Sequence, residues 1–444
     1  MALTRRSLLT TAAGAAGTAL AATACGAGPG GAPDLEAAAH GPAGPATLRW
    51  WSFAMATHEG GDLRTDLIRA FRELHPDIEV EIVNAPAVTD ISRTVLSTAL
   101  VSGAATPDVY MGDVAWPGQF AYNALATPLS PVVPGDYWRA YPEEVITALS
   151  WEGDVYAFPF FGDQAFLFYR ADLLERHRIE VPRTWEEVAE AAARVRRAGG
   201  AETGLVLQGA AYEGLTANVA EFVADAGGGI LDADGTEVTF GGRAGERALG
   251  WLAGAAESGV LPRAAATFRE QEATDAFTGG GALFLRNWSY VWGVVDAPDS
   301  PVRGRVGVAV RPGFEGGPAR GHGCLGGWCN FVNPHGRNLG AAVAFARFCA
   351  EEEAQALMMR TSAYLPALTS LRESAEARAS RTPTLALAGE VRLVPRPTQT
   401  PRYPQVSKAI YTRVNTVLNG RTAPGDALAA ARSEIADALA GRSL

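Results

Sequence analysis

Strand and helix signals alternate along the chain after its first 45 residues. Residues 47–53 carry the aromatic and apolar side chains of a strand, and leucine and phenylalanine recur at helical spacing over 62–75. Isoleucine and valine then alternate with acids over 78–82, which is typical of a half-buried strand. A helix over about 92–102 and a strand over 107–111 follow. This alternation predicts an α/β doubly wound fold, in which helices cover a largely parallel sheet.

The length of the chain, 444 residues, is too great for one ordinary core, so we expect two lobes. The apolar run 155–170 is too long for one strand and too interrupted for a helix, which indicates a crossing between lobes. Further crossings are expected at 281–285 and 325–333. The expected division places residues 46–157 and 282–326 in lobe 1 and residues 158–281 and 327–444 in lobe 2.

The first 25 residues have the features of an export signal and not of a fold. The sequence of Thr4–Leu9, TRRSLL, is that of a twin-arginine signal, with an ordinary secretory signal as the alternative. Small residues before Cys25 indicate a lipoprotein cleavage site, so we expect a lipid on Cys25. The apolar run before it is too short to cross a bilayer. Residues 26–45 are rich in glycine, alanine and proline, which predicts a flexible tether.

Charge and composition exclude several kinds of function. The net charge is −10, or −12 without residues 1–24, and there is no basic run, which argues against a nucleic-acid partner. Lys408 is the only lysine, so no P-loop or Schiff-base lysine lies upstream of it. The histidines are isolated, and we expect no metal and no cofactor. Cys324 and Cys329 are too far apart in an extended segment for a disulfide, so with Cys349 we expect three buried thiols.

The segment 279–293, GGGALFLRNWSYVWG, is the most informative one for function. It places three aromatic residues beside an arginine and an asparagine: Trp288, Tyr290, Trp292, Arg286 and Asn287. Flat aromatic faces next to hydrogen-bonding groups suit a ligand with apolar C–H faces and a hydroxyl rim, as in a sugar. The alternative is that these aromatic side chains belong to the core. We favour ligand contacts for Trp288 and Tyr290.

Carboxylates at the expected strand ends are further candidates for binding. Asp113 follows the strand at 107–111, and Asp163 lies at the expected crossing between lobes. A carboxylate there can accept hydrogen bonds from two sugar hydroxyls at once. The alternatives are a helix N-cap for Asp113 and a solvated loop acid for Asp163. Glu59, which follows the first strand, is another candidate acceptor, with an exposed surface acid as its alternative.

Two more candidates lie where the backbone is constrained. Gly327 lets the backbone approach a ligand closely, and Trp328 offers a stacking face; the alternative is a β-bulge with a core tryptophan. Arg396 lies between two prolines and can donate several hydrogen bonds, with a surface arginine as its alternative.

Paired carboxylates also allow a different function. A secreted glycosidase would use Asp113 and Asp163 as its two catalytic acids. No base beside a nucleophile supports turnover, so we expect a binding protein and not an enzyme.

Several segments together resemble a known family. From about Thr47 to Arg442, the chain is similar to the extracellular trehalose/maltose-binding proteins of ABC transporters. The segments that carry the resemblance are DVYMGDVAWPGQF (108–120), YAFPFFGDQAFLFYRADLL (156–174), Gln208 to Leu215, RNWSYVWG (286–293), LGGW (325–328) and VPRPTQTPRYPQ (394–405).

The resemblance implies a two-lobed, periplasmic-binding-protein-like fold that closes about a hinge on a disaccharide such as trehalose or maltose. The implied ligand contacts are Glu59, Asp113, Asp163, Trp288, Tyr290, Gly327, Trp328 and Arg396. The implied role is the solute-binding component of an ABC sugar importer, anchored by lipid to the outer face of the cytoplasmic membrane. It would deliver the sugar to permease subunits, and we expect it to be a monomer. Phe161 and Ser289 depart from the family, where we expect tyrosine and proline.

Overall fold

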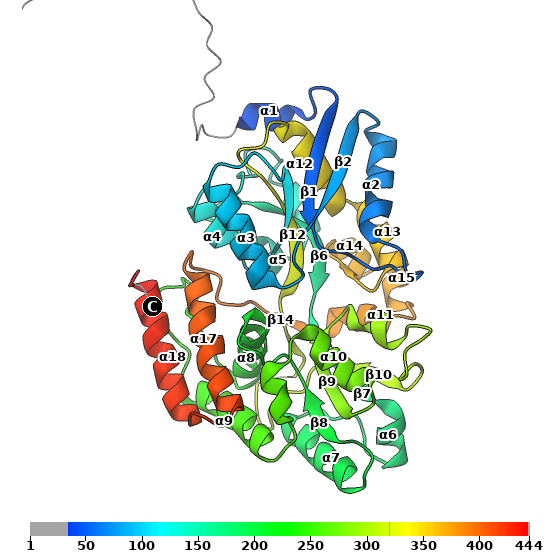
Figure 1. Cartoon of the computed structure of the whole chain (residues 1–444), viewed down its shortest axis with the longest axis vertical. Helices are drawn as coiled ribbons and strands as arrows, with labels where there is room; N and C mark the ends of the chain where they lie inside the picture. The colour runs from blue at the N-terminus through cyan, green and yellow to red at the C-terminus, as the bar shows by residue number, and fades with distance from the viewer. Residues whose placement is uncertain (1–33, 319, 443–444) are drawn as a thin grey trace, which may run out of the picture. The chain divides into compact units, whose positions relative to one another are not determined.

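The computed structural model describes residues 34–318 and 320–442, which form two lobes around separate sheets (Figure 1). The first lobe holds a six-stranded sheet in the order β13-β6-β12-β3-β1-β2, and the second a four-stranded sheet in the order β10-β7-β9-β8. The first sheet packs into one hydrophobic core, and the second sheet packs into two others. The predicted two-lobed α/β fold is therefore confirmed.

The elements of the first lobe come from both halves of the chain. Its sheet consists of β1 (Ala46–Ser52), β2 (Ile78–Asn84), β3 (Val109–Asp113), β6 (Ala157–Asp163), β12 (Gly326–Val332) and β13 (Leu365–Pro366). Its helices are α1 (Leu35–His40), α2 (Leu63–Leu74), α3 (Thr89–Val101), α4 (Pro117–Tyr122), α5 (Glu143–Ala148), α12 (Leu339–Ala350), α13 (Glu352–Thr361), α14 (Thr369–Arg372), α15 (Ala375–Arg378) and α16 (Pro383–Ala386). A small hairpin, β4 (Ser150–Trp151) and β5 (Asp154–Val155), follows α5.

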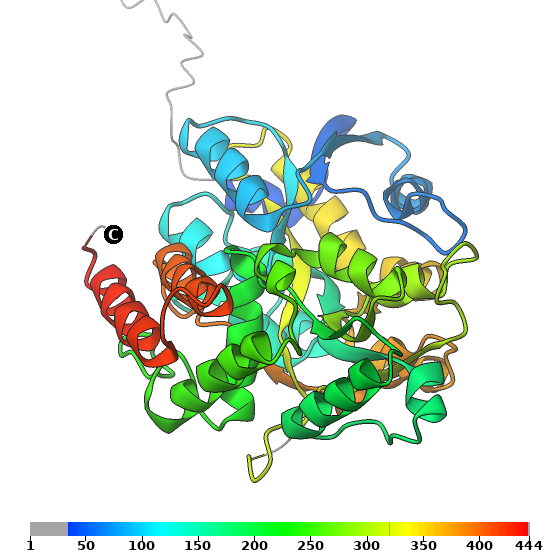
Figure 2. The ribbon, with the colours of Figure 1, turned by 60° about the horizontal axis from the view of Figure 1, so that its bottom comes forward.

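The second lobe is built mainly from the middle of the chain. Its sheet consists of β7 (Ala165–Arg170), β8 (Thr203–Val206), β9 (Ala282–Trp288) and β10 (Val306–Ala309). Its helices are α6 (Ala171–Arg176), α7 (Trp185–Arg197), α8 (Glu213–Asp225), α9 (Gly242–Glu257), α10 (Glu270–Thr278), α11 (Val291–Val295), α17 (Tyr403–Leu418) and α18 (Pro424–Leu439). Helices α17 and α18 pack against each other and against α8 and α9 at one side of the lobe (Figure 2).

The predicted local elements agree with the structure where the signals were strong. Asp62 caps α2, and its side chain accepts a hydrogen bond from the amide of Arg64. Thr184 and Glu187 form the predicted capping box at the start of α7. Asp113 is the last residue of β3, as the spacing predicts.

The predicted lobe boundaries differ from the structure. The chain leaves the first sheet between β6 and β7, inside the expected crossing 155–170, but residues 158–163 belong to β6 of the first lobe and not to lobe 2. However, β9 pairs with β7 and β8, so residues 281–285 are not a crossing and residues 282–326 do not belong to lobe 1. The chain returns to the first sheet at β12, so residues 327–444 are not all in lobe 2. The division into lobes is set by pairing between strands that are far apart in the sequence, and local hydrophobic periodicity carries no information about such pairing.

A short parallel pair, β11 (His322–Cys324) with β14 (Arg392–Val394), lies against α8 of the second lobe. The last crossing from the first lobe therefore comes between α16 and β14. After β14, the proline-rich residues 395–402, which include Arg396, lead into α17 of the second lobe.

Part of the predicted tether is folded. Helix α1 lies inside the range 26–45, and Ala38 on it is only 1% exposed because α1 packs on α12. Burial of the Ala38 side chain stabilises this helix against the first lobe, so the packed chain begins before residue 46. The expected export signal, Cys25 and residues 26–33 lie outside the described residues. In the part of the chain that is described, no helix is long and apolar enough to cross a membrane.

We expect Gly112→Ala to destabilise the protein by about 1–3 kcal/mol, because the core around β3 has no space for a methyl group. A Cβ at Gly112 would lie 2.6 Å from ring carbons of Phe331 and of Trp116. Gly135→Ala is the control, since no atom lies within 4 Å of a Cβ there. Denaturant unfolding measures both variants, and equal stability of the two would contradict the prediction.

Candidate functional site

The candidate site is a cavity of about 460 Å³ lined by both lobes. This volume lies in the range of small-molecule sites. Every predicted ligand-binding residue except Glu59 lines it: Asp113, Asp163, Trp288, Tyr290, Gly327, Trp328 and Arg396. Glu59 is exposed on the loop between β1 and α2, so the structure does not bring it to this cavity.

Strand β12 brings the first-lobe residues of the cavity together. It lies between β3 and β6, with Trp328 opposite Asp113 on one side and Gly326 opposite Asp163 on the other. Residues separated by more than 150 positions in the sequence therefore meet at one edge of the sheet.

Glycines at the start of β12 allow close approach of the neighbouring strand β6 and of the other lobe. Gly327 has a φ of 121°, and a Cβ there would lie 2.5 Å from the carbonyl oxygen of Phe161, so a side chain is excluded. A Cβ on Gly326 would lie 2.8 Å from Cζ3 of Trp288. The indole of the second lobe thus rests directly on the backbone of the first.

Aromatic rings from both lobes form the walls of the cavity. Trp328 is half-buried and packs edge-on against Phe53, with 4.7 Å between the two ring centroids. Trp288 packs on the guanidinium of Arg286, 4.4 Å from the ring centroid. Tyr290 of the second lobe lies with its ring centroid 6.5 Å from that of Tyr364 of the first. These contacts fix the rings in place, which reduces the entropy lost when a ligand stacks on them.

Asp163 presents one carboxylate oxygen to the cavity. Its Oδ1 accepts hydrogen bonds from the amide of Ser289 at 2.9 Å, from Ser289 Oγ at 2.5 Å and from the amide of Gln164 at 2.9 Å. The three bonds fix Oδ1, while Oδ2 takes part in none of them. Burial raises the pKa of Asp163 to about 6, against the effect of the hydrogen bonds from Ser289. Ser289, which departs from the expected proline, thus supplies two of the three donors.

Asp113 and Arg396 belong to a buried ionic network and are not isolated groups. Arg396 is 4% exposed and donates to both oxygens of Asp113, and to Glu213 Oε1 at 2.7 Å. Tyr403 donates to the same Glu213 oxygen, and Ser407 Oγ lies 2.6 Å from the other. Burial alone lowers the pKa of Arg396, but the charges around it, that of Asp113 above all, raise it well above its usual range. Arg396 Nε has no partner among the described residues.

Sequence reasoning missed several residues of the cavity. They are Phe53, Tyr212, Glu213, Arg269, Glu270 and Tyr364. Glu213 and Tyr212 lie in a segment that carried the family resemblance, but a glutamate at the start of a helix is ordinary. Tyr364 had no signal, since its place depends on the pairing of β13 with β6.

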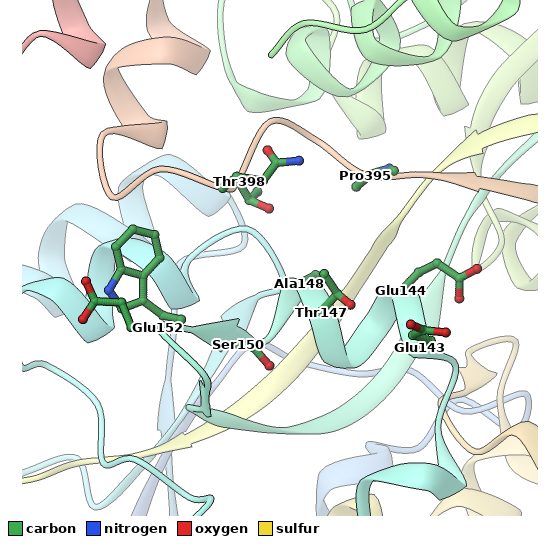
Figure 3. Close-up of a pocket in the computed structure, with 10 residues that line it drawn as sticks. Glu143, Glu144, Thr147, Ala148, Ser150, Glu152, Pro395 and Thr398 are labelled. Atoms are coloured by element: carbon green, nitrogen blue, oxygen red, sulfur yellow. The ribbon is translucent and has the colours of Figure 1, made fainter. Parts of the chain in front are cut away.

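A second hollow of about 470 Å³ lies between α5 and the segment 395–399 (Figure 3). Its lining residues are Glu143, Glu144, Thr147, Ala148, Ser150, Trp151, Glu152, Pro395, Thr398 and Gln399. Trp151 is its only aromatic residue, so it has no facing rings to hold a ligand. The cavity between the lobes remains the candidate site.

Metal or thiol chemistry has no support in the described residues. No group of three or more histidine, cysteine, aspartate or glutamate side chains in residues 34–318 and 320–442 is placed to hold a metal ion. Cys324, Cys329 and Cys349 are buried free thiols, as the sequence predicts. Burial raises the pKa of the Cys324 thiol to about 12.

Residues 56–356 match the family described as bacterial extracellular solute-binding protein. A relative from Deinococcus radiodurans, called "Probable ABC transporter-binding protein", is 30% identical over 368 residues, 80% of this chain and 86% of the relative. The mannitol-binding protein of Pseudomonas aeruginosa is 25% identical over 295 residues, 64% of this chain and 65% of that protein. The structure of maltose-bound T. maritima MalE3 is 28% identical with a TM-score of 0.80, and the match covers 88% of this chain and 99% of that chain.

We expect Asp163→Asn to become more stable relative to the wild type as the pH rises from 4 to 8. The folded-state pKa of Asp163 is raised from 3.8 to about 6, so its contribution to stability is present below pH 4 and is lost as the pH passes 6. Asparagine keeps an acceptor oxygen for Ser289 but carries no charge. Between pH 4 and pH 8, the free energy of unfolding of Asp163→Asn should rise relative to that of the wild type by at most about 3 kcal/mol.

Denaturant unfolding of both proteins at pH 4 and pH 8 measures this difference, with Asp77→Asn at an exposed position as control. A stability difference between Asp163→Asn and wild type that does not change with pH would contradict an ionised, buried Asp163.

Proposed function

We propose, from the premise that the chain belongs to the bacterial extracellular solute-binding proteins, that it is the sugar-binding component of an ABC importer. The family consists of substrate-binding proteins of transporters and not of enzymes. Within that role, we propose an oligosaccharide ligand, of the trehalose or maltose type.

One observation carries this proposal: Trp328 and Trp288, from different sheets, line the same cavity beside Asp163. Indole faces suit the C–H faces of a sugar ring, and the free oxygen of Asp163 suits its hydroxyl groups. The maltose bound to MalE3, a structure of similar fold, supports this substrate class. The relative from Pseudomonas aeruginosa is named for binding mannitol, another polyhydroxylated compound, which also supports a ligand rich in hydroxyl groups.

The charges of the cavity argue against an anionic solute. Arg396 is already bound to Asp113 and Glu213, so one cation faces two carboxylates. Asp163 adds a third carboxylate with no cation in hydrogen-bonding contact. The other charged residues that line the cavity are one cation, Arg269, and two acids, Glu270 and Glu272. An anion would therefore meet repulsion, whereas neutral hydroxyl groups can donate hydrogen bonds to these oxygens.

The mechanism we propose is closure of the two lobes about the three crossing segments. A ligand that contacts Trp328 and Asp163 of the first lobe and Trp288 of the second interacts best when the lobes are together. Only this difference in affinity between the open and closed forms can drive closure.

The family places the protein outside the cytoplasm. We propose that Cys25 carries a lipid that anchors it to the outer face of the membrane, where it delivers sugar to permease subunits as a monomer. The twin-arginine signal and the tether support this arrangement.

We expect calorimetric titration with trehalose and maltose to show binding, and Trp288→Ala or Trp328→Ala to weaken it about 30-fold. Loss of a stacking ring in a desolvated site costs roughly 2 kcal/mol. Trp292→Ala is the matched control, because Trp292 lies in the same aromatic segment and does not line the cavity. Asp113→Ala should weaken binding by a similar factor, because it leaves sugar hydroxyl groups without an acceptor and Arg396 with Glu213 as its remaining carboxylate partner.

The same samples distinguish the rival function of a glycosidase. Glucose released at a useful rate would favour catalysis by Asp113 and Asp163, whereas intact sugar after titration favours binding. If the folded tryptophan variants bind as tightly as wild type, the site is wrong. If wild type binds neither sugar, the substrate class is wrong.

We expect Cys25→Ser to release the protein from membranes without unfolding it, because the lipid would be its only anchor. Fractionation of cells followed by immunoblotting measures the distribution, with Cys349→Ser, a buried thiol of the first lobe, as control. Membrane retention of the Cys25→Ser variant would contradict the lipid anchor.

A further inference from the structure

Helix α8 of the second lobe begins with an amide that is capped by the first lobe. Its N-cap residue, Tyr212, makes no side-chain capping bond. Instead, Asp90 Oδ2 on α3 accepts a hydrogen bond from the amide of Glu213 at 3.0 Å. The first amides of a helix have no partner inside it and carry partial positive charge, so a carboxylate is favourable there. Here that carboxylate comes from the opposite lobe.

Glu213 therefore takes part in two bridges between the lobes at once. Its amide binds Asp90 of α3, and its carboxylate binds Arg396, which also holds Asp113 at the end of β3. A third contact lies nearby, where the guanidinium of Arg402 is 5.9 Å from the ring of Tyr122 at the end of α4. Each of the three contacts joins protein groups only, so none of them requires a ligand.

We propose that Asp90 is a positioning residue that holds the first turn of α8 against the first lobe and so keeps the cavity closed before sugar enters. This inference rests on the proposed function, because holding the cavity closed serves sugar binding. Asp90 does not line the cavity, so it acts through Glu213 and Arg396 and not by touching the ligand. The aromatic walls and the carboxylates are thereby brought into their binding arrangement in advance.

Asp66 provides a matched control. Asp90 lies in the first turn of α3 and pairs with Arg93 three residues on, and Asp66 lies in the first turn of α2 and pairs with Arg69 in the same way. Removing either acid removes a local ion pair with an arginine three residues further along the helix. Only Asp90 has a bond to the second lobe.

The test is small-angle X-ray scattering of the ligand-free, full-length chain carrying Cys25→Ser, so that it stays in solution. We expect Asp90→Ala to lower the ratio of closed to open molecules roughly tenfold and to increase the radius of gyration, since a charge-assisted bond is lost. Asp90→Asn keeps an acceptor oxygen and should open the cavity less. Asp66→Ala should scatter as the parent does.

An unchanged radius of gyration for Asp90→Ala would overturn the proposal, and so would an equal increase for Asp66→Ala. A parent protein that is already open without ligand would overturn it as well. Because no sugar is added, failure to bind trehalose or maltose would contradict the proposed function and leave this measurement independent of it.

Discussion

The buried guanidinium of Arg396 is the interaction on which the arrangement of the cavity depends. It joins Asp113, at the end of a first-lobe strand, to Glu213, at the start of a second-lobe helix. A buried ionic group is costly to leave unpaired, and removing one partner of such a pair costs about 3–5 kcal/mol. The main effect of the network is therefore to fix the position of the two carboxylates relative to each other. Its contribution to the stability of either lobe is secondary.

The sequence predicts what local patterns determine. The capping box of Thr184, the helix from Asp62 and the strand that ends at Asp113 all follow from signals within a few residues. The boundaries of the lobes do not, because β12 joins the first sheet by pairing with strands more than 150 residues earlier. The folded part of the tether was missed because six residues of an alanine-rich helix are stable only when packed on α12.

The candidate site was predictable to the extent that its residues are chemically unusual. Tryptophans beside glycines and an arginine between prolines stand out in any sequence. Glu213 and Tyr364 do not, since their roles come from the network with Arg396 and from the edge strand β13. The predicted role of Arg396 as a free donor also changes, because its two terminal nitrogens are already bound to carboxylates and only Nε lacks a partner.

The same charges that fix the cavity also select what can enter it. Asp163 is 8% exposed and its pKa is raised to about 6 by burial, so at neutral pH it is an ionised group short of donors. Closing the lobes removes water from it, and the hydrogen bonds lost with that water must be replaced. A ligand rich in hydroxyl groups replaces them and covers the indole faces with its C–H groups. Closure of the lobes and recognition of the ligand thus both require that hydroxyl groups replace the water bound to Asp163.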